Sequence, residues 1–152
     1  MRKLAVKFAG TAVALVMLSA SISLYAATRE EAVAMVKKVE AFYKKYGKAR
    51  MLEEVQKKRG QFVNGELYAC VIDLNGIMLA HPRLSAWVGK NYLTVHDPDG
   101  RYFVREAVVQ LKAKNECWVE YRWEDPETKK IGLKITYFLR VDDFIIACGV
   151  WK

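Results

Sequence analysis

Few side chains in this 152-residue chain can do acid–base or metal chemistry, because it contains two histidines and three cysteines. His81 ends an apolar run and is followed by Pro82, while His96 precedes Asp97 and lies close to Asp99. A histidine at a strand end can fill a core, cap a turn, act as a general base, bind a metal or donate to a ligand. No G-x-S-x-G motif or Cys–His–acid set accompanies His81, which disfavours catalysis. The group around His96 is typical of a turn and a helix cap, so we expect no metal.

The cysteines Cys70, Cys117 and Cys148 form no C-x-x-C pair and no haem-attachment motif. A cysteine-based metal site is therefore not expected. In an oxidising compartment this odd number leaves two alternatives, which are one disulfide with a free thiol or three buried thiols.

Lys134 is the best candidate for a ligand-binding cation, because it interrupts a run of strand-forming residues. A small carboxylate needs one cation, one or two neutral donors and an apolar floor. Tyr121 and Trp123 share a face of the preceding strand by period two and would suit a short-chain acid. The alternatives are a lysine that faces solvent and a plain aromatic core. Strict alternation puts Tyr137 on the face opposite Lys134, so Tyr137 ranks lower.

The first element predicted after residue 27 is a long helix. Thr28 is suited to its N-cap, and Glu30 and Glu31 favour its first turn. Apolar residues then recur at helical spacing along residues 32–46. Gly47 predicts a break before a second helix over residues 49–58.

The pattern of the remaining residues predicts mainly strands. Residues 67–73 and 77–81 form a hairpin through Leu74-Asn75-Gly76, and residues 82–96 look irregular. A helix over residues 101–114, which Asp99 could cap, and strands over 118–123, 133–141 and 144–151 follow. This order predicts an α+β fold with an antiparallel sheet.

Residues 1–27 have the layout of a secretory signal peptide, with an early positive charge, a long apolar stretch and small residues at its end. The alternative is an uncleaved membrane anchor. Cleavage would leave one domain of about 125 residues, residues 28–152, outside the cytoplasm. The formal net charge is +8 for the whole chain and about +5 for residues 28–152, where it is spread over clusters that solvated helix faces explain. We therefore expect no nucleic-acid partner, although the positive field favours anionic ligands.

A series of short segments resembles, in order, the single-Cache type 2 group of extracellular sensor domains. The matching segments are residues 60–63, Tyr68 with 72–76, 79–82, 88–91, 97–100, 103–106, 118–123, 134–137 and 148–151. One departure is Asn115-Glu116-Cys117, where the family has a small, Gly-rich lead into its third strand.

The resemblance implies a PAS-like, five-stranded antiparallel sheet with a long N-terminal helix and a helix inserted between strands 2 and 3. It also implies a sensor of small carboxylates such as acetate, propionate, pyruvate or lactate, with no enzymatic activity and no cofactor. It points to the position of Lys134, puts His81 beneath the insertion that roofs the pocket, and adds Tyr68 to the expected ligand contacts. PAS-like sheets place the first and last strands side by side, which makes Cys70–Cys148 the expected pair if one disulfide forms.

Such domains are usually fused to a transmembrane helix and a cytoplasmic signalling module, as in chemotaxis. This chain looks like a free-standing periplasmic version that would need a membrane-bound signalling or transport partner. A homodimer through the N-terminal helix is a further expectation. Two other functions stay open: an enzyme that uses His81 with a carboxylate, and an interaction module without a working pocket.

Overall fold

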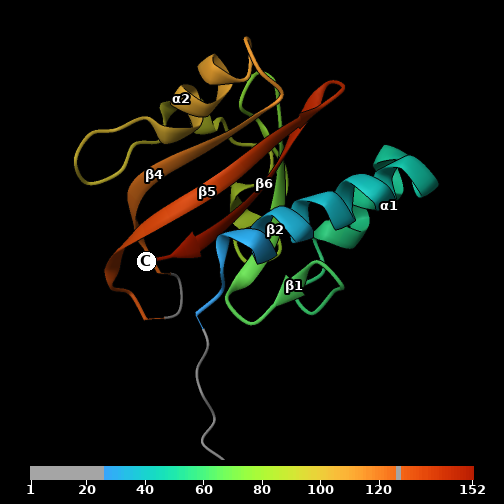
Figure 1. Ribbon diagram of the computed structural model, residues 1–152, viewed down its shortest axis with the longest axis horizontal. Coiled ribbons are helices and arrows are strands. Elements are labelled where there is room, and N and C mark those ends of the chain that lie inside the picture. Colours follow the sequence, from blue (N-terminus) through green and yellow to red (C-terminus); the bar gives the residue numbers. More distant parts are fainter. Residues whose placement is uncertain (1–25, 126–127) are drawn as a thin grey trace, which may run out of the picture.

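The computed structural model describes residues 26–125 and 128–152. The expected signal peptide therefore lies almost wholly outside the described residues. A long helix, α1 (Arg29–Val55), lies across one face of an antiparallel sheet, and a short helix, α2 (Phe103–Gln110), packs on the other face (Figure 1). The expected α+β, PAS-like architecture is confirmed, including the helix inserted between the hairpin and the last three strands.

The sheet contains six strands, which all pair antiparallel. They are β1 (Val63–Asn64), β2 (Leu67–Asp73), β3 (Met78–Ala80), β4 (Glu116–Glu124), β5 (Ile131–Val141) and β6 (Phe144–Trp151). Their order is β1-β2-β6-β5-β4, and β3 pairs with β2 outside this path. The five expected strands are β2 to β6, and the two-residue β1 is an addition.

Helix α1 begins at a complete capping box. The Thr28 hydroxyl accepts the Glu31 N–H at 3.2 Å, and the Glu31 carboxylate accepts the Thr28 N–H at 2.7 Å, which satisfies two backbone donors at the helix start. Gly47 interrupts the helix with φ 80° and ψ 170°, as expected, and the helical segment beyond it ends at Val55 rather than at residue 58. Among residues 26–125 and 128–152, no helix combines the length and apolar character needed to span a membrane.

The turn between β2 and β3 ties the irregular segment 82–96 to the sheet. The Asp73 carboxylate accepts the N–H groups of Asn75 and Ile77 at 2.9 and 2.7 Å. Gly76 has φ +81°, and a Cβ there would lie 2.9 Å from Cδ2 of Leu93 and closer still to its Cγ. Glycine is therefore required both by the turn and by the close approach of a segment far along the chain.

The expected Cys70–Cys148 disulfide is wrong, and all three cysteines are free thiols. Strands β2 and β6 are neighbours as expected, but Ala69, not Cys70, lies opposite Cys148. Because side chains alternate along a strand, Cys70 and Cys148 point to opposite faces of the sheet. Cys148 packs in the core beneath α1, whereas Cys70 packs against the core on the α2 side.

Helix α2 is shorter than the expected 101–114, and Asp99 does not cap it. Its N-cap residue is Tyr102, which makes no side-chain capping bond. The side chain that holds the turn is that of Asp97, whose carboxylate accepts the N–H groups of Asp99, Arg101 and Arg122 at 3.0, 2.8 and 3.1 Å. These bonds fix the turn before α2 against strand β4.

Candidate ligand-binding site

A small cavity lies on the α2 side of the sheet, between the strands and the inserted segment. The space open to the centre of a water-sized sphere is about 50 Å³, which is room for a few water molecules or a small organic acid. Five of the six expected contacts line it, namely Tyr68, His81, Tyr121, Trp123 and Lys134.

Lys134 lies on β5 and is 4% exposed, so the alternative of a lysine facing solvent is wrong. Its Nζ donates to the Tyr68 hydroxyl at 3.1 Å. It also lies 4.8 and 4.7 Å from the ring centres of Tyr68 and Trp151. No acidic side chain forms an ion pair with Lys134 within the described part of the chain. A buried ammonium without a counter-charge is costly unless a bound anion supplies one.

Gly149 on β6 provides the space for this lysine. It is the register partner of Thr136, and a Cβ there would lie 2.6 Å from Cε of Lys134 and closer still to Oγ1 of Thr136. Any larger residue would push the lysine stem away from its position. The match between Gly149 and Lys134 explains why a charged side chain can cross the sheet surface here.

His81 has one nitrogen fixed by the backbone. Its Nδ1 accepts the N–H groups of Arg83 at 3.1 Å and Leu84 at 3.0 Å, so the ring proton is on Nε2. Burial, with further contributions from Lys134 and Arg83, lowers the pKa of His81 to about 3. The imidazole is therefore neutral at physiological pH. It caps the turn with Nδ1 and keeps Nε2–H as a donor, so the capping role and the ligand-donor role are compatible in this residue.

The aromatic pair on β4 forms the wall beneath α2. The Tyr121 ring stacks on Phe103 of α2 with centroids 3.9 Å apart, and Trp123 meets Phe103 edge-on at 5.1 Å. The Tyr121 hydroxyl lies 2.9 Å from Oγ1 of Thr136, and burial raises the pKa of Tyr121 to about 12. Tyr121 and Trp123 thus pack in the hydrophobic core and also line the cavity.

Tyr137 does not line the cavity. It alternates with Lys134 along β5 and lies in the core beneath α1, where its hydroxyl donates to Glu116 and its ring lies 5.1 Å from Trp118. Burial, followed by the bond to Glu116, raises the pKa of Tyr137. No bulge brings it to the side of Lys134, so its inclusion among the ligand contacts is corrected.

Tyr92 is the cavity residue that the sequence did not indicate. It begins the short 3-10 helix Tyr92–Thr94 and is 5% exposed. Its hydroxyl is buried and has no hydrogen-bond partner among the described residues. The surrounding segment shows no periodicity, and the placement of Tyr92 depends on the distant contact between Gly76 and Leu93. The Asn91 carboxamide that caps this turn was the one local signal.

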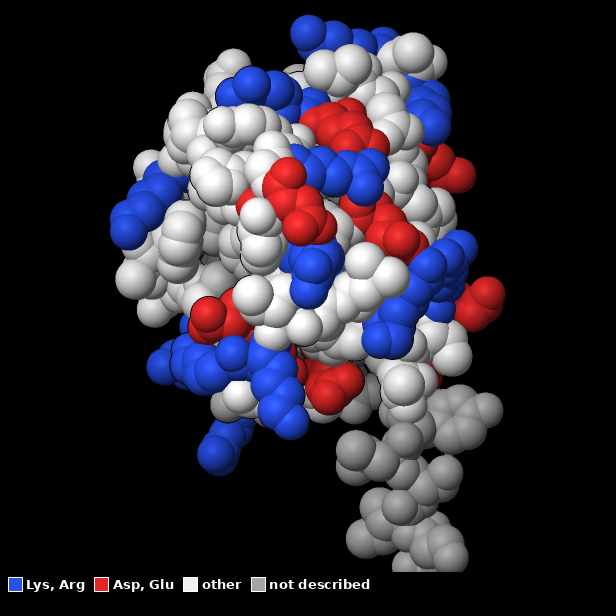
Figure 2. Space-filling view, turned by 90° about the vertical axis from the view of Figure 1, so that its left-hand side faces the viewer, with Lys and Arg blue, Asp and Glu red and all other residues white. Residues whose placement is uncertain are grey.

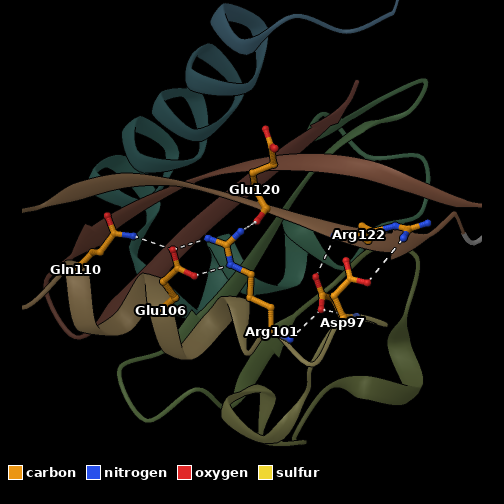
Figure 3. Close-up of polar contacts among 7 residues, drawn as sticks. Asp97, Arg101, Glu106, Gln110, Glu120 and Arg122 are labelled. Carbon is orange, nitrogen blue, oxygen red and sulfur yellow. Dashed lines mark hydrogen bonds and ion pairs between the residues drawn. The ribbon is translucent and has the colours of Figure 1, made fainter.

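A polar network holds α2 over the cavity. Figure 3 shows Arg101 between the helix and the sheet, with two bonds of 2.8 Å to the Glu106 carboxylate and one to the main-chain oxygen of Glu120. Asp97 completes the network through its backbone bonds to Arg101 and Arg122. Although desolvation alone would raise it, the pKa of Asp97 is lowered by these backbone hydrogen bonds.

The described residues offer no group of three potential metal-ligating side chains. The two oxygens of Asp97 are occupied by backbone N–H groups, and His96 Nδ1 lies 2.8 Å from the main-chain oxygen of Asp97. On the face shown in Figure 2, lysine and arginine side chains are interspersed with aspartate and glutamate. Lys134, in contrast, is buried.

Residues 13–150 match the Single Cache domain 2 family. The sensor histidine kinase MctS of Rhizobium johnstonii (strain DSM 114642 / LMG 32736 / 3841) is 31% identical to the chain over 86 residues. That alignment covers 55% of this chain and 18% of the kinase, so the chain spans less than a fifth of that relative.

Several solved structures share the fold. One is a Cache chemosensory domain whose structure was described as a basis for carboxylic acid recognition, with a TM-score of 0.69, 24% identity and coverage of 80% of this chain and 91% of that chain. The periplasmic sensor domain of a chemotaxis protein has a TM-score of 0.64, 22% identity and coverage of 80% and 88%. A methyl-accepting chemotaxis protein from Vibrio parahaemolyticus RIMD 2210633 has a TM-score of 0.64, 19% identity and coverage of 80% and 86%.

The family and the fold agree with the geometry of the site. His81 is oriented by backbone N–H groups rather than by a carboxylate, and Cache sensor domains are non-catalytic, so the enzyme alternative is wrong. The chain belongs to the Single Cache domain 2 family of sensor domains.

Proposed function

We propose that this chain senses a short-chain monocarboxylate bound in the cavity. The observation that carries the proposal is the buried ammonium of Lys134, which meets neutral partners and no acidic side chain within the described residues. A bound carboxylate would neutralise it and form a charge-assisted hydrogen bond away from water. The free protein instead bears the cost of this charge.

The other donors suit the same anion. Tyr68 accepts its bond from Lys134, which leaves its own O–H free to donate to a ligand oxygen. His81 offers Nε2–H, and its ring centre lies 5.1 Å from that of Tyr68. Three donors of this kind match the acceptor positions of one carboxylate.

The remaining wall is apolar and would receive the carbon chain of the acid. It includes Ile72, Met78, Phe138 and Ala147. A cavity of about 50 Å³ favours acids of two to four carbons, since larger ligands need several hundred cubic ångströms. Acetate, propionate, pyruvate and lactate are the candidates. The carboxylic acid recognition described for the related Cache domain supports this class.

The proposal includes an extracytoplasmic location and a signalling partner. The periplasmic sensor domain with the same fold supports export of this chain, in agreement with the signal peptide expected over residues 1–27. The partial match to a sensor histidine kinase supports a membrane-bound kinase or chemoreceptor as the partner. Transfer of a signal to that partner, with or without dimerisation through α1, belongs to the same proposal.

The test is calorimetric titration of the purified protein with two- to four-carbon monocarboxylates. We expect at least one to bind, and we expect Lys134→Met to weaken its binding about 30-fold or more, because the carboxylate would be desolvated without its counter-charge. Lys58→Met is the matched control, since Lys58 is exposed near the end of α1 and should leave binding unchanged. Equal affinity in wild type and Lys134→Met would contradict the site, and absence of binding by every acid would contradict the function.

A further inference from the structure

The hydroxyl of Tyr92 is a buried cavity group with no hydrogen bond among the described residues. The other two phenols each have a partner, because Tyr68 accepts from Lys134 and Tyr121 bonds with Thr136. Tyr92 is 5% exposed, and its buried hydroxyl has no hydrogen-bond partner in the described part of the chain. Leaving such a group unpaired costs free energy, so a residue of this kind in a cavity wall points to a ligand.

The surroundings of Tyr92 hold it in place. Its backbone N–H donates to the Gly76 carbonyl at 2.7 Å, and the next residue, Leu93, packs where Gly76 has no side chain. The Trp87 ring meets the Tyr92 ring at an angle, with centroids 5.2 Å apart. The hydroxyl therefore cannot turn out to solvent without moving the whole segment. Burial also raises the pKa of Tyr92, so the group remains a protonated donor.

We propose that Tyr92 binds a second oxygen of the ligand and thereby selects 2-hydroxy and 2-oxo monocarboxylates over unsubstituted acids. This inference rests on the proposed function. Lys134, Tyr68 and His81 already match the carboxylate, so the Tyr92 hydroxyl is left for another acceptor. The cavity of about 50 Å³ keeps that acceptor close to the carboxylate, at the second carbon of a two- or three-carbon acid.

The charge of the cavity excludes the corresponding amino acids. The lining residues that the structure describes include Lys134 and no aspartate or glutamate. The 2-ammonium group of an amino acid would therefore lie near the like charge of Lys134, and no acidic side chain among the described residues of the cavity wall would pair with it. Such an arrangement is unfavourable in a buried site. A neutral hydroxyl or carbonyl oxygen carries no such cost.

The experiment titrates the purified protein with propionate, lactate (both enantiomers), pyruvate and alanine, which share one three-carbon skeleton. Wild type should bind lactate or pyruvate at least about tenfold more tightly than propionate, and alanine most weakly. Tyr92→Phe should remove this preference while leaving propionate binding unchanged or tighter. Tyr46→Phe is the control, because Tyr46 is half-exposed on α1 and outside the cavity.

Each contrary result has a distinct meaning. An equal loss for all acids in Tyr92→Phe would mean that Tyr92 contacts the carboxylate, which overturns this inference and leaves the proposed function intact. No preference in wild type would mean that water satisfies the hydroxyl, with the same consequence. Failure of every acid to bind would overturn both. The wild-type ratio decides the inference even if Tyr92→Phe does not fold.

Discussion

Burial of the His81 imidazole links the stability of the protein to pH. The pKa of His81 is lowered to about 3, whereas a histidine in an unfolded chain titrates near 6.5. Between these values the unfolded chain binds a proton that the folded protein does not. Stability is therefore complete above about pH 6.5 and declines as the pH falls. We expect a loss of about 2 kcal/mol in the free energy of unfolding between pH 7 and pH 5.

Urea unfolding of wild type and His81→Gln at pH 7, 6 and 5 checks this expectation. The variant should not show this decline in the free energy of unfolding as the pH falls. It should also be less stable at pH 7, because the N–H groups of Arg83 and Leu84 lose their present acceptor. His96→Gln is the control and should keep the wild-type decline, since His81 is retained. A wild-type stability that stays flat between pH 7 and pH 5 would contradict a neutral, buried His81.

At the scale of elements, the turn before α2 depends on one of two neighbouring carboxylates. Asp97 is 2% exposed and accepts three backbone N–H groups, whereas Asp99 forms one long ion pair with Arg122, at 3.7 Å. We expect Asp97→Ala to lower the free energy of unfolding by about 2 kcal/mol, because it leaves backbone donors unsatisfied. Asp99→Ala, the matched control, should change it by less than about 1 kcal/mol.

The same pair tests whether the network in Figure 3 supports the cavity. Asp97→Ala should weaken ligand binding as well, since α2 carries Phe103, which covers Tyr121. Chemical unfolding and calorimetry on both variants provide the measurements. A larger loss of stability in Asp99→Ala than in Asp97→Ala would contradict this assignment and favour Asp99 as the helix cap.

Local patterns determined which elements could be predicted. The N-cap at Thr28, the break at Gly47 and the hairpin around Asn75-Gly76 each involve residues close in sequence, and all three are confirmed. The role of Asp97 could not be predicted in this way, because its bond to Arg122 joins the turn to a strand far along the chain. Tyr92 was not predicted for the same reason, as a contact with Gly76 positions it.

The alternation of side chains along a strand explains which predictions about sheet faces were right and which were wrong. Alternation along β5 correctly predicts opposite faces for Lys134 and Tyr137, because both lie on one strand, and Tyr137 was wrong only as a ligand contact. The faces of Cys70 and Cys148 depend instead on the register between two strands. A shift of one residue reverses every side chain, and no sequence pattern within either strand fixes that register.

At the scale of the whole molecule, the sheet separates two hydrophobic clusters, one beneath α1 and one on the α2 side that contains the cavity. Residues Ile135, Tyr137 and Leu139 of β5 pack beneath α1, while the alternate residues Lys134, Thr136 and Phe138 line the cavity. Strand β5 thus contacts both the proposed ligand and the long helix. The family resemblance could identify this division of the sheet, but the unpaired charge and the unpaired hydroxyl on its cavity side required the structure.

Ligand binding should therefore stabilise the whole fold. An acid at ~100 times its dissociation constant adds about 2.7 kcal/mol to the free energy of unfolding, which raises the melting temperature by several degrees in a domain of this size. Lys134→Met should show no such rise. Without ligand it should melt at or above wild type, because methionine keeps much of the aliphatic stem and removes a buried charge that has no acidic partner among the described residues. Thermal melts of both proteins with and without the acid make the comparison. A variant that melts well below wild type yet keeps the full ligand-induced rise would make Lys134 a structural residue and leave the carboxylate without its proposed cation.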